Sequence, residues 1–145
     1  MARIMNCDGS WVEVDLGQVR RNVAAIRATL GAADVITVVK SDAYGHGLEP
    51  MATALSRAGV RRFAVAYVAE AATVRRAAPD AELILVLGAA RPADVPTMLR
   101  DRIAPVVVST EHGLALSAAA QAAGGRLDVH VKLDTGMRSE EHTSE

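Results

Sequence analysis

Residues 37–47 read Thr-Val-Val-Lys-Ser-Asp-Ala-Tyr-Gly-His-Gly, and the interpretation of the whole chain starts from them. The β-branched run at residues 35–39 predicts a buried strand, and Lys40 ends it. A loop rich in Gly, Asp and Ser follows, and Pro50 then suits the first turn of a helix. Lys40 is therefore expected at the carboxyl end of a strand, where α/β folds bind their ligands.

The composition of the chain draws further attention to Lys40. The chain has fourteen arginines and two lysines, Lys40 and Lys132. A lysine in so arginine-rich a chain indicates chemistry that guanidinium cannot perform. Arginine stays protonated, whereas a lysine amine can form a Schiff base once its pKa is lowered. The alternative is a strand-end lysine whose ammonium simply reaches water, and position and composition leave both open.

Three stretches resemble motifs of the alanine racemase family. Residues 38–47, Val-Val-Lys-Ser-Asp-Ala-Tyr-Gly-His-Gly, resemble the family's pyridoxal-phosphate signature A-V-V-K-A-[ND]-A-Y-G-H-G. Residues 129–137, Val-His-Val-Lys-Leu-Asp-Thr-Gly-Met, are similar to V-H-L-K-x-D-T-G-M-x-R, and residues 11–16 resemble the opening W-x-E-[IV]-D-L. The motifs come in the family's order, and the resemblance covers residues 10–137.

Strand and helix patterns alternate along the chain. The predicted strands cover residues 11–16, 34–40, 62–66, 82–87, 103–108 and 127–133. The first predicted helix has an apolar stripe from Val19 to Leu30. Further helices are predicted at residues 48–58, 68–78, 92–100 and 110–123. Asp15 is expected to cap the first helix, with Gln18 completing a capping box, and Gly31 is expected to stop it.

Strands that are apolar on both faces predict a parallel sheet covered by helices. The pattern leaves open a doubly wound sheet or part of a (β/α)8 barrel, and the resemblance implies the barrel. In the family a β-rich domain follows that barrel. A whole barrel takes about 250 residues. We therefore expect an α/β fold in which residues 1–137 form an incomplete pyridoxal-phosphate-binding barrel domain. It is the N-terminal half of a (β/α)8 TIM barrel, truncated, with a short leading strand.

The last eight residues depart from the family pattern. Arg138 follows Met137 directly, one place earlier than the family's arginine, and residues 139–145 have no counterpart in the family. We interpret residues 138–145 as a non-native tail, with a natural polar tail as the alternative. Arg138 therefore does not inherit the role of the family's arginine, which contacts the cofactor and the substrate carboxylate.

Composition excludes several classes of function. The net charge of −1 gives no basic surface for nucleic acid or for an anionic membrane. No apolar stretch reaches the length of a membrane span, and the first residues lack the apolar core of a signal peptide. Cys7 is the single cysteine, which suits a reducing, cytoplasmic location. His112 and His130 are not spaced with Cys7 like a zinc site, so we assign no metal.

The resemblance assigns roles around Lys40. It implies that Lys40 binds pyridoxal 5'-phosphate covalently and then acts as the catalytic base on one face of the substrate's α-carbon. It implies that the hydroxyl of Tyr44 binds the cofactor phosphate. Gly45 and Gly47 would let the backbone pass close to the ligand. His46 is interpreted as structural.

The resemblance also implies the reaction and the partners. The parent protein would convert L-alanine to D-alanine for peptidoglycan, as a homodimer with shared active sites. The family's second base is a tyrosine from the partner subunit, and nothing in these 145 residues corresponds to it, so the fragment alone is expected to be inactive. Lys132 matches a lysine that is carbamylated in some members, or it pairs with Asp134. The alternatives are a non-catalytic pyridoxal-phosphate-binding barrel protein of cofactor homeostasis, which would lack the Ala-Tyr-Gly-His-Gly extension, and a broad-specificity or serine racemase.

Overall fold

The computed structural model describes residues 2–5, 11–133 and 135. The predicted tail at residues 138–145, Cys7 and Asp134 lie outside these described residues. The strands are β1 (Ala2–Met5), β2 (Trp11–Val14), β3 (Ile36–Val38), β4 (Arg62–Val65), β5 (Leu83–Ala89), β6 (Ala104–Val107) and β7 (His130–Val131). The helices are α1 (Leu16–Leu30), α2 (Lys40–Gly45), α3 (Leu48–Arg57), α4 (Val68–Ala77), the 3-10 turn η1 (Pro92–Asp94), α5 (Val95–Asp101) and α6 (Thr110–Ala122).

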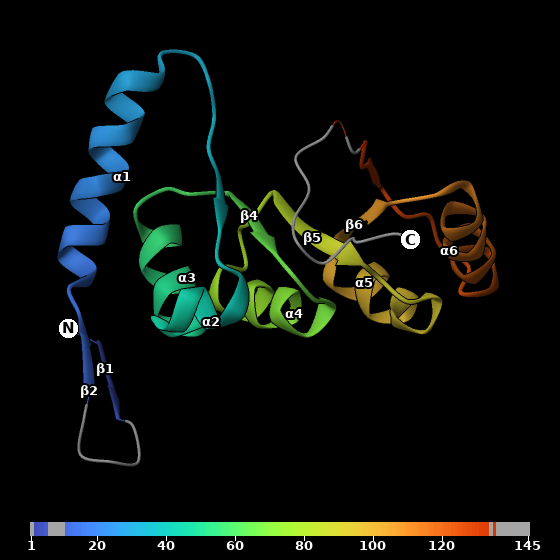
Figure 1. Cartoon of the computed structure of the whole chain (residues 1–145), viewed down its shortest axis with the longest axis horizontal. Helices are drawn as coiled ribbons and strands as arrows, with labels where there is room; N and C mark the ends of the chain where they lie inside the picture. Colours follow the sequence, from blue (N-terminus) through green and yellow to red (C-terminus); the bar gives the residue numbers. More distant parts are fainter. Residues whose placement is uncertain (1, 6–10, 134, 136–145) are drawn as a thin grey trace.

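An antiparallel hairpin, β1 with β2, precedes α1. Ala2 lies opposite Val14, and Met5 lies opposite Trp11. Figure 1 shows this hairpin and α1 on one side of the molecule, apart from the main sheet. The leading strand predicted at residues 11–16 is confirmed as β2, whereas β1 was not predicted because its four residues carry no alternating pattern.

Helix α1 begins and ends as its sequence indicates. The Asp15 carboxylate accepts hydrogen bonds from the backbone N–H of Gly17 at 2.8 Å and of Gln18 at 3.1 Å. The capping box was wrong, because the Gln18 side chain binds Asn22 and Arg21 instead of turning back to Asp15. The predicted stop lies at Gly31, whose φ of 59° favours glycine.

The main sheet has five parallel strands in the order β3-β4-β5-β6-β7, which is the order of the chain. Figure 1 shows α3, α4 and α5 along the same side of these strands. Each connection therefore advances in one direction and keeps its helix on the same face, as in a barrel. A doubly wound sheet would reverse its strand order and carry helices on both faces. The predicted barrel-type α/β fold is confirmed.

Two apolar clusters hold the sheet. The larger lies between the sheet and the helices, and it includes the fully buried side chains of Phe63, Ile84 and Met98. The smaller lies on the other face and consists of Ala64, Leu85, Ala104 and Val106. In the parallel register Ala64 pairs with Leu85, and Leu85 pairs with Ala104, so these residues form a row across three strands. Both faces of the sheet therefore bury apolar residues, as the sequence predicts.

Two apolar grooves flank the sheet. Beyond β3, a groove of about 420 Å³ runs between α1 and α3, and its wall includes Ile36 and Val38. A second groove of about 340 Å³ lies between Val107 at the end of β6, α6 and residues 125–129. Val38 is 39% exposed and Val131 is 70% exposed. In a closed barrel, further strands and helices would cover such edges.

A prediction about acid stability follows from Asp101. Its carboxylate makes two hydrogen bonds of 2.9 Å with the Arg100 guanidinium, and these bonds lower the pKa of Asp101 from its usual 3.8. A lowered folded-state pKa stabilises the fold above pH 3.8, and this contribution is lost as the pH falls through the folded-state value. Asp101→Asn should therefore lower stability by about 0.2–1 kcal/mol near neutral pH.

The difference between Asp101→Asn and the wild type should vanish at a pH well below 3.8, as measured by urea unfolding across pH. Asp80→Asn is the matched control, since Asp80 is exposed and forms no ion pair within residues 11–133. If the free energies of unfolding of Asp101→Asn and the wild type differed as much at low pH as at neutral pH, the stabilisation could not come from the ion pair of Asp101 with Arg100.

Candidate functional site

Lys40 follows the carboxyl end of β3. The strand ends at Val38, but the backbone N–H of the buried Val39 still donates to the carbonyl oxygen of Ala64 at 2.8 Å. Lys40 is then the first residue of α2, and its side chain is half-buried. The predicted strand at residues 34–40 was therefore too long at both ends, and it is not buried as predicted, because Ile36 and Val38 are exposed at the edge of the sheet. The predicted position of Lys40 at the carboxyl edge of the sheet agrees with the structure.

The segment after Lys40 is a left-handed helical turn, where the sequence predicted a loop. Residues 41–44 have φ values of 53–56° and ψ values of 38–54°. Such a conformation costs roughly 1–2 kcal/mol for each residue other than glycine, so the four together cost on the order of 4–8 kcal/mol. Strain of this size persists only where the surroundings impose it, and it gathers at functional sites.

Hydrogen bonds within the segment support the turn. The Ala43 N–H donates to the carbonyl oxygen of Val39 at 3.0 Å, and the Gly47 N–H donates to that of Asp42 at 2.9 Å. The ring of His46 adds to these bonds: its Nδ1 lies 2.9 Å from the carbonyl oxygen of Ala43 and 3.1 Å from that of Tyr44. Nδ1–H is therefore the donor, which agrees with the interpretation of His46 as structural.

Asp42 links the turn to the next helix. Its Oδ1 accepts a hydrogen bond of 2.7 Å from the backbone N–H of Leu48, the first residue of α3. Aspartate and asparagine also tolerate the left-handed region better than most residues. One side chain therefore satisfies an unpaired amide at the start of α3 and suits the strained backbone.

These two roles give a prediction for substitutions at Asp42. Asp42→Asn should be nearly neutral, because the amide oxygen can still accept from Leu48 and asparagine tolerates the left-handed region. Asp42→Ala should lower the free energy of unfolding by about 1–2 kcal/mol, since it removes the cap and keeps the strain. Urea unfolding measures both values, with Asp80→Ala as the exposed control. Equal stability of the alanine and asparagine variants would contradict this role.

Tyr44 lies in the same turn as Lys40 and is 58% exposed. Its backbone φ is 56°, which is rare for an aromatic residue. Beside it, an added Cβ at Gly45 would meet no atom within 4 Å, so this side of the turn is open space. The structure thus places Lys40 and Tyr44 on one short segment, beside an exposed glycine.

Lys132 lies at the other edge of the sheet. Its backbone N–H donates to the carbonyl oxygen of Val107 at 2.9 Å, and its side chain is exposed. Lys40 follows β3 and Lys132 follows β7, so the two lysines lie after the two edge strands of the sheet. The predicted alternative partner, Asp134, is outside the described residues.

His112 has a local structural role. Its Nε2 lies 2.8 Å from the carbonyl oxygen of Ala90, and its Nδ1 accepts from the backbone N–H of Val108 at 3.4 Å. Both ring nitrogens are therefore occupied, with the proton on Nε2. This histidine ties the start of α6 to the end of β5.

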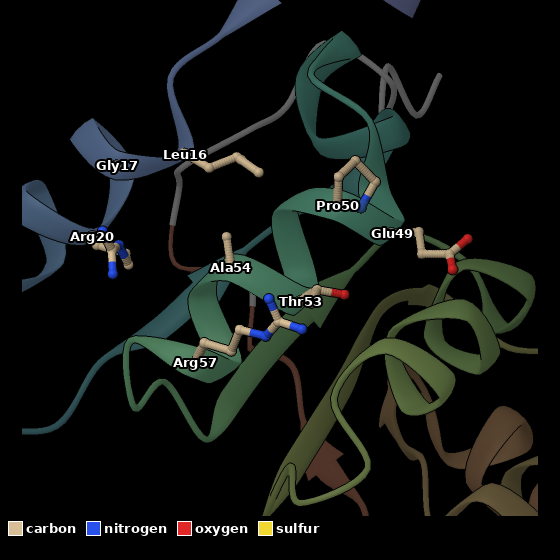
Figure 2. A pocket seen from close by; sticks show the side chains of 8 residues that line it. All are labelled: Leu16, Gly17, Arg20, Glu49, Pro50, Thr53, Ala54 and Arg57. Atoms are coloured by element: carbon tan, nitrogen blue, oxygen red, sulfur yellow. The ribbon is translucent and has the colours of Figure 1, made fainter. Parts of the chain in front are cut away.

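A groove near the amino end of the chain is separate from Lys40. It has a volume of about 550 Å³ and lies between the start of α1 and the length of α3. Figure 2 shows Leu16 and Arg20 on one wall, with Ala54 and Arg57 on the other. Neither Lys40 nor Tyr44 lines it. It is a gap between α1 and α3. Away from this gap, Arg27 of α1 connects the two helices through hydrogen bonds to the carbonyl oxygens of Ala58 and Gly59, just after α3.

Sequence analysis gave no role to Asp42 or Glu70, the two carboxylates that bind backbone amides around the turn. Glu70 lies three residues after Tyr67, which precedes α4, and this spacing is typical of a carboxylate that caps a helix. That signal could have identified the cap. Nothing in the sequence pattern indicates the contact between Glu70 and the turn, because the two lie on different elements.

Comparison with known proteins shows which proteins this chain resembles. Residues 14–139 match the family described as alanine racemase, N-terminal domain. An alanine racemase from Symbiobacterium thermophilum is 39% identical over 136 residues, which cover 92% of this chain and 36% of that protein. The crystal structure of alanine racemase from Bacillus anthracis with bound L-Ala-P superposes with a TM-score of 0.77 at 33% identity, over 86% of this chain and 32% of that one.

A histidine racemase from Leuconostoc mesenteroides has the same fold in this region. Its structure matches with a TM-score of 0.71 at 28% identity, over 79% of this chain and 30% of that one. The chain spans about a third of the length of the proteins that it matches. The shared region is thus common to racemases that differ in substrate.

Proposed function

Because the chain belongs to the alanine racemase family, through its N-terminal domain, we propose that it supplies the lysine that binds pyridoxal phosphate in an amino acid racemase. The observation that carries this proposal is the left-handed turn at residues 41–44, which holds Lys40 and Tyr44 on one rigid segment at the carboxyl edge of the sheet. In this proposal Lys40 serves for cofactor attachment and for one half of the proton transfer.

The residues present fit pyridoxal phosphate. The cofactor needs a primary amine for its aldehyde carbon and hydrogen-bond donors for its phosphate. Among the described residues, the Nζ of Lys40 and the hydroxyl of Tyr44 form no hydrogen bond or ion pair, so both are available. Gly45 is exposed, and an added Cβ there would meet no atom within 4 Å, so the backbone at this point would not obstruct a ligand.

Pyridoxal phosphate, when bound, supplies an electron sink that makes the α-proton of an amino acid acidic enough to remove. Lys40 would hold the cofactor through Nζ, and the same nitrogen would then take or return the proton on one face of the α-carbon. Tyr44 Oη would donate to a phosphate oxygen and fix the orientation of the cofactor. The turn places the backbones of Lys40 and Tyr44 on one short segment, which would favour the positioning of both side chains at one ligand.

We propose alanine as the substrate and D-alanine for peptidoglycan as the product of the longer protein, a cytoplasmic homodimer with shared sites. Residues 1–137 would form the incomplete barrel domain, and residues 138–145 a non-native tail. Inversion needs a second base on the opposite face, so this chain alone should bind the cofactor without racemising alanine. The similarity to a histidine racemase keeps a racemase of other amino acids as the second candidate.

A chimera tests the proposal. Residues 14–133 replace the matching third of the Symbiobacterium thermophilum relative, and L-alanine, L-serine and L-histidine are offered in turn with pyridoxal phosphate. Chiral chromatography should show D-alanine from the chimera and none from the 145-residue chain. A folded chimera that binds the cofactor but inverts none of the three would favour a non-catalytic carrier. Preference for serine or histidine would replace alanine as the substrate.

A further inference from the structure

Glu70 connects two of the loops that follow the sheet strands. It is the third residue of α4, and its side chain is half-buried. Its Oε2 accepts hydrogen bonds from the backbone N–H of Ala66 at 2.9 Å and of Tyr67 at 3.3 Å. Its Oε1 accepts from the backbone N–H of Asp42 at 3.4 Å. The first oxygen caps the helix to which Glu70 belongs, while the second reaches the left-handed turn after β3.

The contact with Asp42 differs from the other bonds of the turn. Ala43, Gly47 and Leu48 bind atoms within residues 39–48, so these bonds move with the segment. Within the described residues, the bond to Glu70 is the single hydrogen bond that joins residues 41–45 to an element other than the adjoining helix α3. Together with the bond from the Val39 N–H to the Ala64 carbonyl oxygen, it relates the turn to the end of β4 and the start of α4.

The chemistry of the contact suits this task. A carboxylate has two oxygens that accept hydrogen bonds, so one side chain can bind amides on two loops at once. Hydrogen bonds from backbone N–H groups to an ionised acceptor are stronger than those between neutral groups. Glutamine would offer one acceptor oxygen and would have to give up one of the two loops.

We propose that Glu70 is a positioning residue for cofactor attachment: by holding the Asp42 amide, it fixes the turn that presents Lys40 and Tyr44. This inference rests on the proposed function, which gives Lys40 and Tyr44 their roles in binding the cofactor. The competing account is that Glu70 only caps α4. The two accounts differ at Asp42, because a cap alone would not protect an amide on another element.

Two substitutions separate these accounts in the 145-residue chain. Glu70→Ala removes both contacts. Glu70→Asp shortens the side chain by about 1.5 Å, the length of one carbon–carbon bond. It keeps a carboxylate near the start of α4 but withdraws it from Asp42, where the wild-type bond is already long at 3.4 Å. Glu111→Ala is the matched control, since Glu111 lies in the first turn of α6, away from the turn.

The first readout is amide hydrogen exchange by NMR, which needs no cofactor. Exchange at Asp42 should accelerate about tenfold in Glu70→Ala and in Glu70→Asp, and should not change in Glu111→Ala. Exchange at Ala66 and Tyr67 should accelerate in Glu70→Ala but stay near the wild-type rate in Glu70→Asp. A Glu70→Ala chain that fails to fold leaves Glu70→Asp as the deciding variant.

The second readout is the attachment of pyridoxal phosphate, trapped with borohydride and mapped by mass spectrometry. The yield at Lys40 should fall about tenfold in Glu70→Asp, while the yield at Lys132 stays constant. Unchanged exchange at Asp42, or an unchanged yield at Lys40 in Glu70→Asp, would overturn the positioning role. If the wild-type chain is not labelled at Lys40, the proposed function fails, and exchange at Asp42 still decides whether Glu70 holds the turn.

Discussion

Lys40→Ala is expected to abolish the covalent attachment of pyridoxal phosphate to this chain. In the proposed function the Nζ of Lys40 is the nucleophile, and residues 41–44 of the adjoining left-handed turn carry no amine. Lys40→Arg should fail equally, because guanidinium stays protonated. In the chimera with a longer relative, racemisation should fall by at least about 10²–10⁴-fold, the contribution of a positioned acid–base group.

Folding should be nearly unaffected by this substitution. Lys40 is half-buried, and its amine forms no ion pair within the described residues, so Lys40→Ala should change stability by no more than about 0.5 kcal/mol. Visible absorbance of the added cofactor and urea unfolding measure the two effects separately. Lys132→Ala is the control and should keep the absorbance. A Lys40→Ala chain that binds the cofactor as the wild type does would contradict the assignment.

Phe63→Ala should have the largest effect on stability. Phe63 is the single phenylalanine of the chain; it lies on β4 with none of its surface exposed, between Thr37 on β3 and Ile84 on β5 in the register. Truncating a buried phenylalanine costs about 3–5 kcal/mol through lost burial and the cavity that remains. Domains of this size have a net stability of about 5–15 kcal/mol, and two open sheet edges place this one at the lower end.

Circular dichroism and urea unfolding test this expectation. Leu114→Ala is the matched control, because Leu114 is 67% exposed on α6, and it should change stability by no more than about 0.5 kcal/mol. A Phe63→Ala chain as stable as Leu114→Ala would show that the cluster between the sheet and the helices does not hold the fold.

The sequence predicted three of the helices closely, whereas α1 buries none of its residues despite its apolar stripe, and the helix predicted at residues 92–100 is divided into η1 and α5. Helices α3, α4 and α6 begin where predicted, and each ends one residue earlier. The last strand was overestimated: residues 127–133 are apolar in alternation, but β7 contains two residues, because no strand beyond it extends the ladder in the described part of the chain. Strand order needed the structure, since periodicity does not say which strands are neighbours.

The left-handed turn could not have been predicted from its own residues. Ser41, Asp42, Ala43 and Tyr44 are ordinary in loops or right-handed helices, and glycine appears only after them, at Gly45 and Gly47. The conformation depends on bonds to atoms elsewhere, such as the Leu48 amide and the Glu70 carboxylate. Lys40 and Tyr44 were selected through the motif that they share, whereas the backbone conformation between them depends on tertiary contacts.

The most direct test of the central claim compares the two lysines of the wild-type chain. Both have accessible amines, but only Lys40 adjoins the strained turn and the open space beside Gly45. The chain is incubated with a stoichiometric amount of pyridoxal phosphate, reduced with borohydride and mapped by mass spectrometry. The account predicts that Lys40 carries nearly all of the label. Equal labelling of Lys40 and Lys132, or preference for Lys132, would contradict it.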